Sequence, residues 1–245
     1  MARSSPTRRV RRPARHIVAM GGGGFLMEPD NPLLDDYVLD LVAKSRPKIS
    51  FLATATGDHP SMIEKFYRAF AGPRSDATHL PLFGLDKRDI RTYILSQDVI
   101  YVGGGNVANM MAVWQLHGIG LMLEEAWKRG VVLAGVSAGA LCWYEGGTTD
   151  SFGPQLAPFR AGLKLLSGTV CVHYDGEARR RPIYHELVRD GMPAGIALDD
   201  GAAAHYVGTT LREIVTSRPK AGAYAVARVR GKAVERPLRV RYLGV

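Results

Sequence analysis

Short apolar runs rich in β-branched residues alternate along residues 16–145 with segments whose apolar residues recur at helical spacing. His16–Met20 is one such run. After it, Leu34, Val38 and Leu41 fall on one stripe of a helix that Asp30 or Asn31 can cap. The same pattern predicts strands over 48–54, 78–82, 98–102 and 131–134, and helices over 61–70, 89–95, 107–117 and 121–129. This alternation predicts a three-layer α/β fold around a mostly parallel, doubly wound sheet.

The last third of the chain has a different pattern. Strands are predicted over 167–173 and 195–198, with an extended segment over 202–206 and a helix over 182–190. Alternation over 223–230 and 234–242, on either side of Gly231 and Lys232, predicts a C-terminal β-hairpin. With no internal repeat and no composition typical of a linker, residues 16–245 are expected to form one domain.

The net charge of +9 is concentrated at the N-terminus. Residues 1–15 hold six arginines and no acid, and without them the net charge falls to +3. We expect this segment to be a disordered basic arm. Basic residues elsewhere are scattered, without the interleaved aromatic residues of a nucleic-acid-binding surface, so nucleic acid is not an expected partner.

Composition and motifs also indicate where the protein is located in the cell and whether it binds a cofactor. No apolar run reaches the roughly 18 residues of a membrane span, and two cysteines, Cys142 and Cys171, suggest neither a disulfide framework nor a zinc site. A cytoplasmic protein without membrane association is therefore expected. The run Gly21–Gly24 does not match the dinucleotide-binding fingerprint, and no phosphate-binding P-loop is present, so no cofactor or metal is expected.

A candidate nucleophile follows the strand predicted at 131–134. Residues Gly135–Gly139 fit the pattern G-x-S-x-G around Ser137, and a helix can begin at Ala140. This strand–turn–helix context is typical of a nucleophile elbow, although the serine of such a turn can also simply cap the helix. In a parallel sheet the glycine-rich segments that end the strands meet at one edge, so Gly21–Gly24 and Gly103–Gly105 are expected near Ser137.

A serine nucleophile needs a base, an acid and an oxyanion hole. His173, at the end of a predicted strand, is the preferred base over His185 and His205. The N–H groups of Ala138 and of Gly104 or Gly105 are the expected oxyanion donors. The residues alone leave the acid open among several carboxylates: Asp150, Asp175, Asp199, Asp200 and Glu145.

Several segments together resemble the dipeptidase E/cyanophycinase family of serine peptidases. The residues that carry the resemblance are Met20–Gly23, Tyr101–Asn106, Gly135–Ala140, Thr148–Asp150, Val172–His173 and Gly195–Ala203. The resemblance implies a glutamine-amidotransferase-like fold and a Ser–His–acid triad without a cofactor, with Ser137 as nucleophile and His173 as base. It points to Asp150 as the acid in dipeptidase E-like members and to Asp200 in cyanophycinase-like members. Of the two, Asp150 is preferred.

Members of that family act on aspartyl peptides, which implies a small aspartyl peptide as substrate here. A guanidinium would suit the substrate carboxylate, and Arg180 is the preferred candidate in the cluster Arg179–Arg181. Gly105 and Asn106 are the other expected substrate-binding residues, and a homodimer is a further expectation.

Two other functions are considered. An α/β-hydrolase esterase shares the order Ser, Asp, His, but only 36 residues separate Ser137 from His173, whereas that fold usually places its histidine near the C-terminus. A non-catalytic protein whose basic arm contacts nucleic acid is the other alternative.

Overall fold

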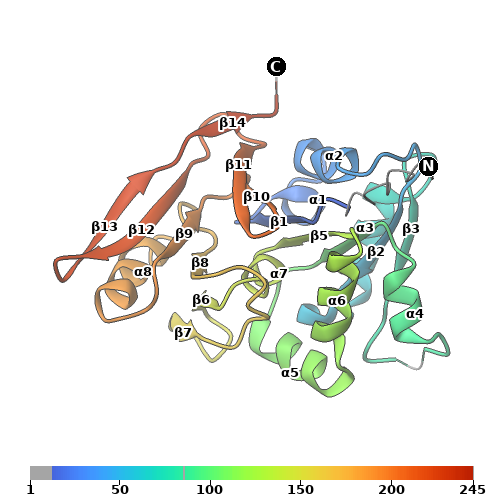
Figure 1. The fold of residues 1–245 in the computed structure, drawn as a ribbon, viewed down its shortest axis with the longest axis horizontal. Helices are drawn as coiled ribbons and strands as arrows, with labels where there is room; N and C mark the ends of the chain where they lie inside the picture. Colours follow the sequence, from blue (N-terminus) through green and yellow to red (C-terminus); the bar gives the residue numbers. More distant parts are fainter. Residues whose placement is uncertain (1–12, 85, 245) are drawn as a thin grey trace, which may run out of the picture.

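The computed structural model describes residues 13–84 and 86–244. The predicted disordered arm falls almost wholly on residues 1–12, outside the described residues. The chain forms a mixed α/β fold with two sheets rather than the single sheet predicted from the sequence. Figure 1 shows one sheet through the centre and right of the molecule, and the second toward the left.

The first sheet has eight strands in the order β14-β11-β10-β1-β5-β4-β2-β3. Its strands are β1 (His16–Met20), β2 (Lys48–Leu52), β3 (Asp76–His79), β4 (Val99–Val102), β5 (Val132–Val136), β10 (Ala202–Val207), β11 (Thr210–Thr216) and β14 (Val240–Tyr242). Strands β1 to β5 run parallel, as predicted, while β10 joins β1 antiparallel. The carboxyl ends of β1, β4 and β5 therefore lie side by side.

The second sheet has six strands in the order β13-β12-β9-β8-β6-β7. They are β6 (Gly146–Thr149), β7 (Ala157–Phe159), β8 (Thr169–Cys171), β9 (Gly195–Leu198), β12 (Ala223–Val229) and β13 (Lys232–Pro237). Strands β12 and β13 pair antiparallel, but the predicted strand 234–242 is wrong as one element. The chain leaves the second sheet at Pro237 and pairs with β11 of the first from Val240 onward.

Seven of the eight α-helices in the described residues lie on the two faces of the first sheet, and α8 packs on the second sheet. The helices are α1 (Gly24–Met27), α2 (Leu33–Asp40), α3 (Pro60–Phe70), α4 (Ile90–Leu95), α5 (Val107–His117), α6 (Ile119–Lys128), α7 (Ala138–Leu141) and α8 (Arg180–Arg189), with a 3-10 turn at Thr54–Thr56. Their ends follow capping chemistry: Asp89 accepts the N–H of Thr92 to begin α4, and Asn106 accepts that of Asn109 to begin α5.

The alternation of side chains along the strands divides the core. Val18 and Met20 of β1 pack with the face covered by α1, α2 and α3. Ile17 and Ala19 point to the other face, where α4 to α7 and the second sheet share one core. Helix α8 packs separately on the second sheet (Figure 1). Because the second sheet joins the core on the α5–α7 side, segments from both sheets meet at the carboxyl ends of β1 and β5.

Candidate active site

Ser137 occupies the turn between β5 and α7 in a conformation rare for a residue with a side chain, with φ 56° and ψ −114°. Both glycines of the motif are sterically required. A Cβ on Gly135 would overlap the carbonyl of Gly139, and one on Gly139 would overlap the carbonyl of Val102. The tight packing holds the serine in a strained backbone state, as is common for residues at functional sites.

His173 lies beside this serine. Its Nε2 is 2.8 Å from Ser137 Oγ, and its side chain is only 13% exposed. Strand β8 ends at Cys171, and His173 follows with a positive φ of 53°. This is the histidine predicted from the sequence. The two competitors bond elsewhere, His185 to Glu235 and His205 to Tyr37.

The carboxylate at the other ring nitrogen is that of Asp200. Its Oδ1 lies 2.7 Å from His173 Nδ1, which completes a hydrogen-bonded Ser137–His173–Asp200 chain. The bond from His173, together with the nearby guanidinium groups of Arg218 and Arg180, holds the pKa of Asp200 below its ordinary value despite burial. A carboxylate acceptor at Nδ1 fixes the histidine tautomer that leaves Nε2 able to accept the serine proton.

Asp150, the preferred acid of the sequence analysis, is placed differently. Its side chain is 62% exposed, and its charged neighbour is Arg180, 3.8 Å away. The geometry thus corrects that preference in favour of Asp200, the alternative acid. Asp150 follows β6, which pairs with β8 in the second sheet. Asp200 lies in the turn between β9 and β10, and β10 is the neighbour of β1 in the first sheet.

The end of β1 joins all three segments. The N–H of Ser137 donates to the carbonyl of Met20 at 3.0 Å, that of His173 to Gly21 at 3.2 Å, and that of Gly201 to Gly22 at 3.0 Å. Three consecutive carbonyls therefore hold the turns that carry the serine, the histidine and the aspartate. The sequence predicts that the Gly21–Gly24 run lies near Ser137, but it does not reveal that the carbonyls of residues 20–22 hold these three turns.

The expected oxyanion donors lie at the same edge. Ala138 is the first residue of α7, so its N–H is one of the free donors of a helix start. Gly104 approaches Ser137 so closely that an added Cβ would lie 3.1 Å from the serine Cβ and 3.6 Å from its Oγ. The structure brings these two segments together beside the serine side chain.

The three predicted substrate-binding residues make contacts within the protein. Asn106 caps α5 and donates from Nδ2 to the carbonyl of Ser151 at 3.0 Å. Gly105 packs on the carbonyl of Ala55, which leaves no room for a Cβ. Arg180 is 3% exposed and donates to Glu177 and to the carbonyl of Thr148. Their role in substrate binding remains a prediction.

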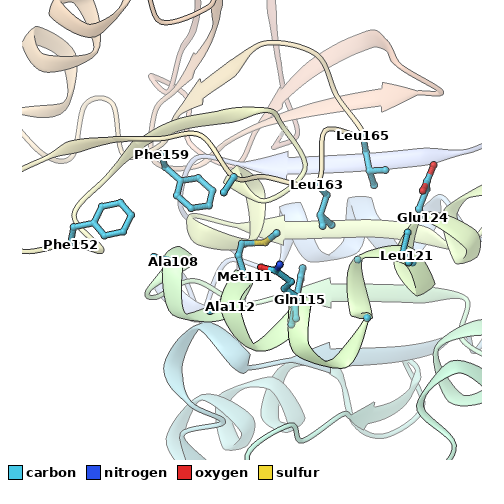
Figure 2. A pocket seen from close by; sticks show the side chains of 14 residues that line it. Ala108, Met111, Ala112, Gln115, Leu121, Glu124, Phe152, Phe159, Leu163 and Leu165 are labelled. Carbon is cyan, nitrogen blue, oxygen red and sulfur yellow. The ribbon is translucent and has the colours of Figure 1, made fainter.

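A large apolar cavity lies elsewhere. It has a volume of about 610 Å³ and opens between α5, α6 and the segment 152–165. Figure 2 shows Phe152 and Phe159 at one end and Leu121, Leu163 and Leu165 toward the other. None of the residues of the Ser137–His173–Asp200 chain lines it.

Comparison with known proteins fits this geometry. The model of peptidase family S51 matches residues 17–214. The chain belongs to peptidase family S51. It is therefore a serine-type peptidase, and the resemblance found in the sequence is confirmed.

Relatives agree with this family. The chain is 47% identical over 231 residues to the uncharacterized peptidase YgaJ of Bacillus subtilis (strain 168), covering 94% of this chain and 100% of that protein. The crystal structure of a peptidase from an acI-B1 Actinobacterium matches with a TM-score of 0.67 at 16% identity, covering 94% of this chain and 96% of that one. A candidate peptidase E from Listeria monocytogenes EGD-e matches with a TM-score of 0.61 at 17% identity, covering 84% and 98%.

The family assignment distinguishes among the three functions that the sequence allows. Membership in S51 favours the peptidase over the α/β-hydrolase esterase and over the non-catalytic binding protein. Within the described residues, no helix is both long enough and apolar enough to cross a membrane.

Proposed function

We propose that this peptidase hydrolyses aspartyl bonds in small peptides, with Ser137 as nucleophile, His173 as base and Asp200 as acid. The observation that carries the proposal is the unbroken hydrogen-bonded chain from Ser137 Oγ through His173 to Asp200, with separations of 2.8 and 2.7 Å. Both distances suit the transfer of a proton from the serine to a histidine held by a carboxylate.

The proposed reaction follows acyl-transfer chemistry. Ser137 Oγ attacks the scissile carbonyl while His173 Nε2 takes the serine proton. Asp200 stabilises the resulting imidazolium, and the N–H groups of Ala138 and Gly104 stabilise the developing oxyanion. The imidazolium then protonates the departing amine, and water releases the acyl group by the same steps in reverse order.

The proposed substrate follows from the family resemblance. An aspartyl substrate brings a carboxylate, and Arg180 is the proposed cation for it, with Gly105 and Asn106 at the edge of the site. Removal of an N-terminal aspartate from a short peptide is the first candidate reaction. A cytoplasmic location and a homodimer remain predictions.

The placement of Asp200 favours a second candidate. The resemblance links an acid at this position to cyanophycinase-like members, which cut β-aspartyl-arginine units. Cleavage of a β-aspartyl bond is therefore the alternative to cleavage of an α-aspartyl bond.

A matched peptide series tests the proposal. Purified protein is incubated with α-Asp-X dipeptides, β-Asp-Arg and X-Asp controls, and the products are quantified by mass spectrometry. We expect cleavage of aspartyl bonds by the wild type and a loss of about 10³-fold or more in kcat for Ser137→Ala. Wild-type hydrolysis that survives in Ser137→Ala would contradict the proposal, as would a wild type that leaves every aspartyl peptide intact.

The acid is tested with a pair of isosteric variants. Asp200→Asn should lower kcat by about 10³–10⁴-fold, because the amide favours the wrong histidine tautomer. Asp150→Asn should stay within about threefold of the wild type, because this exposed carboxylate faces Arg180 and is not the partner of His173. The reverse order of losses would restore Asp150 as the acid.

A further inference from the structure

Asp175 lies two residues beyond His173, in the segment that leads to α8. Its Oδ1 accepts the backbone N–H of Asp200 at a distance of 2.8 Å. Asp175 as a whole is an exposed residue. One short segment therefore contacts the aspartate twice, through the ring of His173 and through the side chain of Asp175.

The turn around Asp200 explains why the second contact matters. The neighbouring N–H groups donate to backbone carbonyls: Asp199 to Gly222 at 3.1 Å, Gly201 to Gly22 at 3.0 Å, and Ala202 to Asp199 at 3.0 Å. The N–H of Asp200 is held by a side chain instead. Asp200 is 8% exposed, so an N–H left without an acceptor there would favour rearrangement of the turn.

Glycines confine the Asp200 side chain on both sides. A Cβ on Gly22 would overlap Asp200 Oδ1, and one on Gly176 would overlap its Oδ2. The side chain thus fills a narrow space, and its direction depends on the position of the Asp200 backbone. A hydrogen bond that fixes the Asp200 N–H fixes the position of this backbone relative to the segment that carries His173.

We propose that Asp175 is a positioning residue, which sets the orientation of Asp200 toward His173 by accepting the Asp200 N–H. This inference rests on the proposed role of Asp200 as the acid of the site. Asp175 contacts neither Ser137 nor His173 in the described structure and acts through Asp200.

The proposal requires an acceptor at residue 175, not a charge. The hydrogen bond from His173 and the charges of Arg218 and Arg180 already hold the pKa of Asp200 low. Burial and, to a smaller extent, the Asp175 carboxylate raise the pKa of Asp199. An amide oxygen can accept the same N–H. Asp175→Asn should therefore preserve the function of the carboxylate, and Asp175→Ala should abolish it.

The test compares Asp175→Ala, Asp175→Asn and the control Asp190→Ala, which removes an exposed aspartate paired with Arg189 at the end of α8. We expect Asp175→Ala to lower kcat on the cleaved aspartyl peptide by about tenfold to a hundredfold, with KM within about twofold. Asp175→Asn and Asp190→Ala should remain within about threefold of the wild type. Thermal unfolding followed by circular dichroism checks that each variant is folded.

Two readouts need no peptide. The first is the rate at which a fluorophosphonate labels Ser137, which should fall in parallel with kcat in Asp175→Ala only. The second is the low-field proton resonance of the His173 Nδ1–H, which should shift or broaden in Asp175→Ala and persist in Asp175→Asn. A folded Asp175→Ala variant with wild-type kcat, labelling rate and resonance would overturn the proposal, as would Asp175→Asn losing as much as Asp175→Ala.

Failure of the proposed substrate is distinguishable from failure of this inference. If the wild type is labelled by the fluorophosphonate but cleaves no aspartyl peptide, the substrate is wrong, and a slower labelling of Asp175→Ala still supports the positioning role. If the wild type is neither labelled nor active, Ser137 is not an activated nucleophile, and both proposals fall.

Discussion

At the scale of single residues, the site depends on backbone positions that few residues can occupy. Ser137 and His173 both have positive φ values, and each is held there by an N–H bond to the end of β1. Gly22 leaves the space that the Asp200 carboxylate fills. Backbone bonds and the absence of a side chain at Gly22 therefore help to set the positions of the three side chains.

A side chain at residue 22 would fill the space that the Asp200 carboxylate occupies. Gly22→Ala places a methyl group where Asp200 Oδ1 lies and 2.9 Å from His173 Nδ1. We expect the carboxylate to be displaced and kcat to fall by about a hundredfold, because small errors in catalytic geometry are costly. Steady-state kinetics measures the loss. Gly84→Ala is the control, since nothing lies within 4 Å of a Cβ at that glycine. Equal activity of the two variants would contradict the prediction.

Part of the site could be predicted from residues alone. The sequence indicates Ser137 because its motif is local. It indicates His173 because this residue ends a predicted strand, where the carboxyl edge of the sheet is expected. The partner of His173 could not be recognised in the same way, because Asp200 comes 27 residues later, after α8 and β9. Whether Asp150 or Asp200 reaches the ring depends on the order of strands in the second sheet, which no local pattern reveals.

At the scale of elements, α1 and α2 pack against the end of β1 on one face of the first sheet. Asp35 of α2 is 1% exposed and accepts the hydroxyl of Tyr101 at 3.3 Å, and it also bonds the backbone of Phe25 in α1. Burial raises the pKa of Asp35 to about 7. A titratable group therefore lies inside the core beneath the glycine run.

This burial predicts a pH-dependent stability. Because the pKa of Asp35 is raised in the folded protein, the folded state binds a proton that the unfolded state has released between about pH 4 and pH 7. The contribution of Asp35 to stability is present below its unfolded pKa and is lost as the pH rises through about 7. The loss is about 2–4 kcal/mol by linkage.

Asp35→Asn removes this titration while an amide oxygen can still accept the same bonds. We expect the free energy of unfolding of the variant, relative to the wild type, to increase between pH 5 and pH 8. Denaturant unfolding at both pH values measures it. Asp40→Asn, at the exposed end of α2, removes the same charge and should show no such trend. A difference between Asp35→Asn and wild type that is constant with pH would contradict the prediction.

The central strands were predictable, as were β8, β9 and β12 of the second sheet, whereas β6, β7 and β11 were not. Strands β1, β2, β4 and β5 are buried apolar runs, and their alternation with helices gives the correct parallel arrangement. By contrast, β6 is Gly146–Thr149 and β7 has three residues, too short for a pattern of period two to emerge. Strand β11 (Thr210–Thr216) carries charged residues on its exposed first half and has no continuous apolar run.

At the scale of the molecule, the two sheets are joined where the site forms. The chain passes from the first sheet to the second after β5, through Ser137, and returns after β9, through Asp200. His173 follows a strand of the second sheet, yet its N–H bonds Gly21 at the end of the first. The relative placement of the sheets therefore determines whether the three side chains meet.

The C-terminal segment is another connection between the sheets, and it predicts a test of this dependence. Beyond Pro237, the N–H of Leu238 bonds Ala223 of the second sheet, and that of Leu243 bonds Thr216 of the first. A chain that ends at Pro237 loses β14 and the packing of Leu243 on the core. We expect its free energy of unfolding to fall by about 1–3 kcal/mol. Its kcat at low temperature should be unchanged, because no residue of the Ser137–His173–Asp200 chain is removed.

Thermal unfolding and kinetics at 15 °C and 40 °C measure the two effects. A chain that ends at Leu243 keeps both bonds and serves as the control. Because the sheets carry different members of the site, we expect the shorter chain to lose activity at a lower temperature than the control, in step with its unfolding. An unchanged melting temperature, or activity lost at 15 °C in a folded protein, would show that this segment does not act by holding the sheets together.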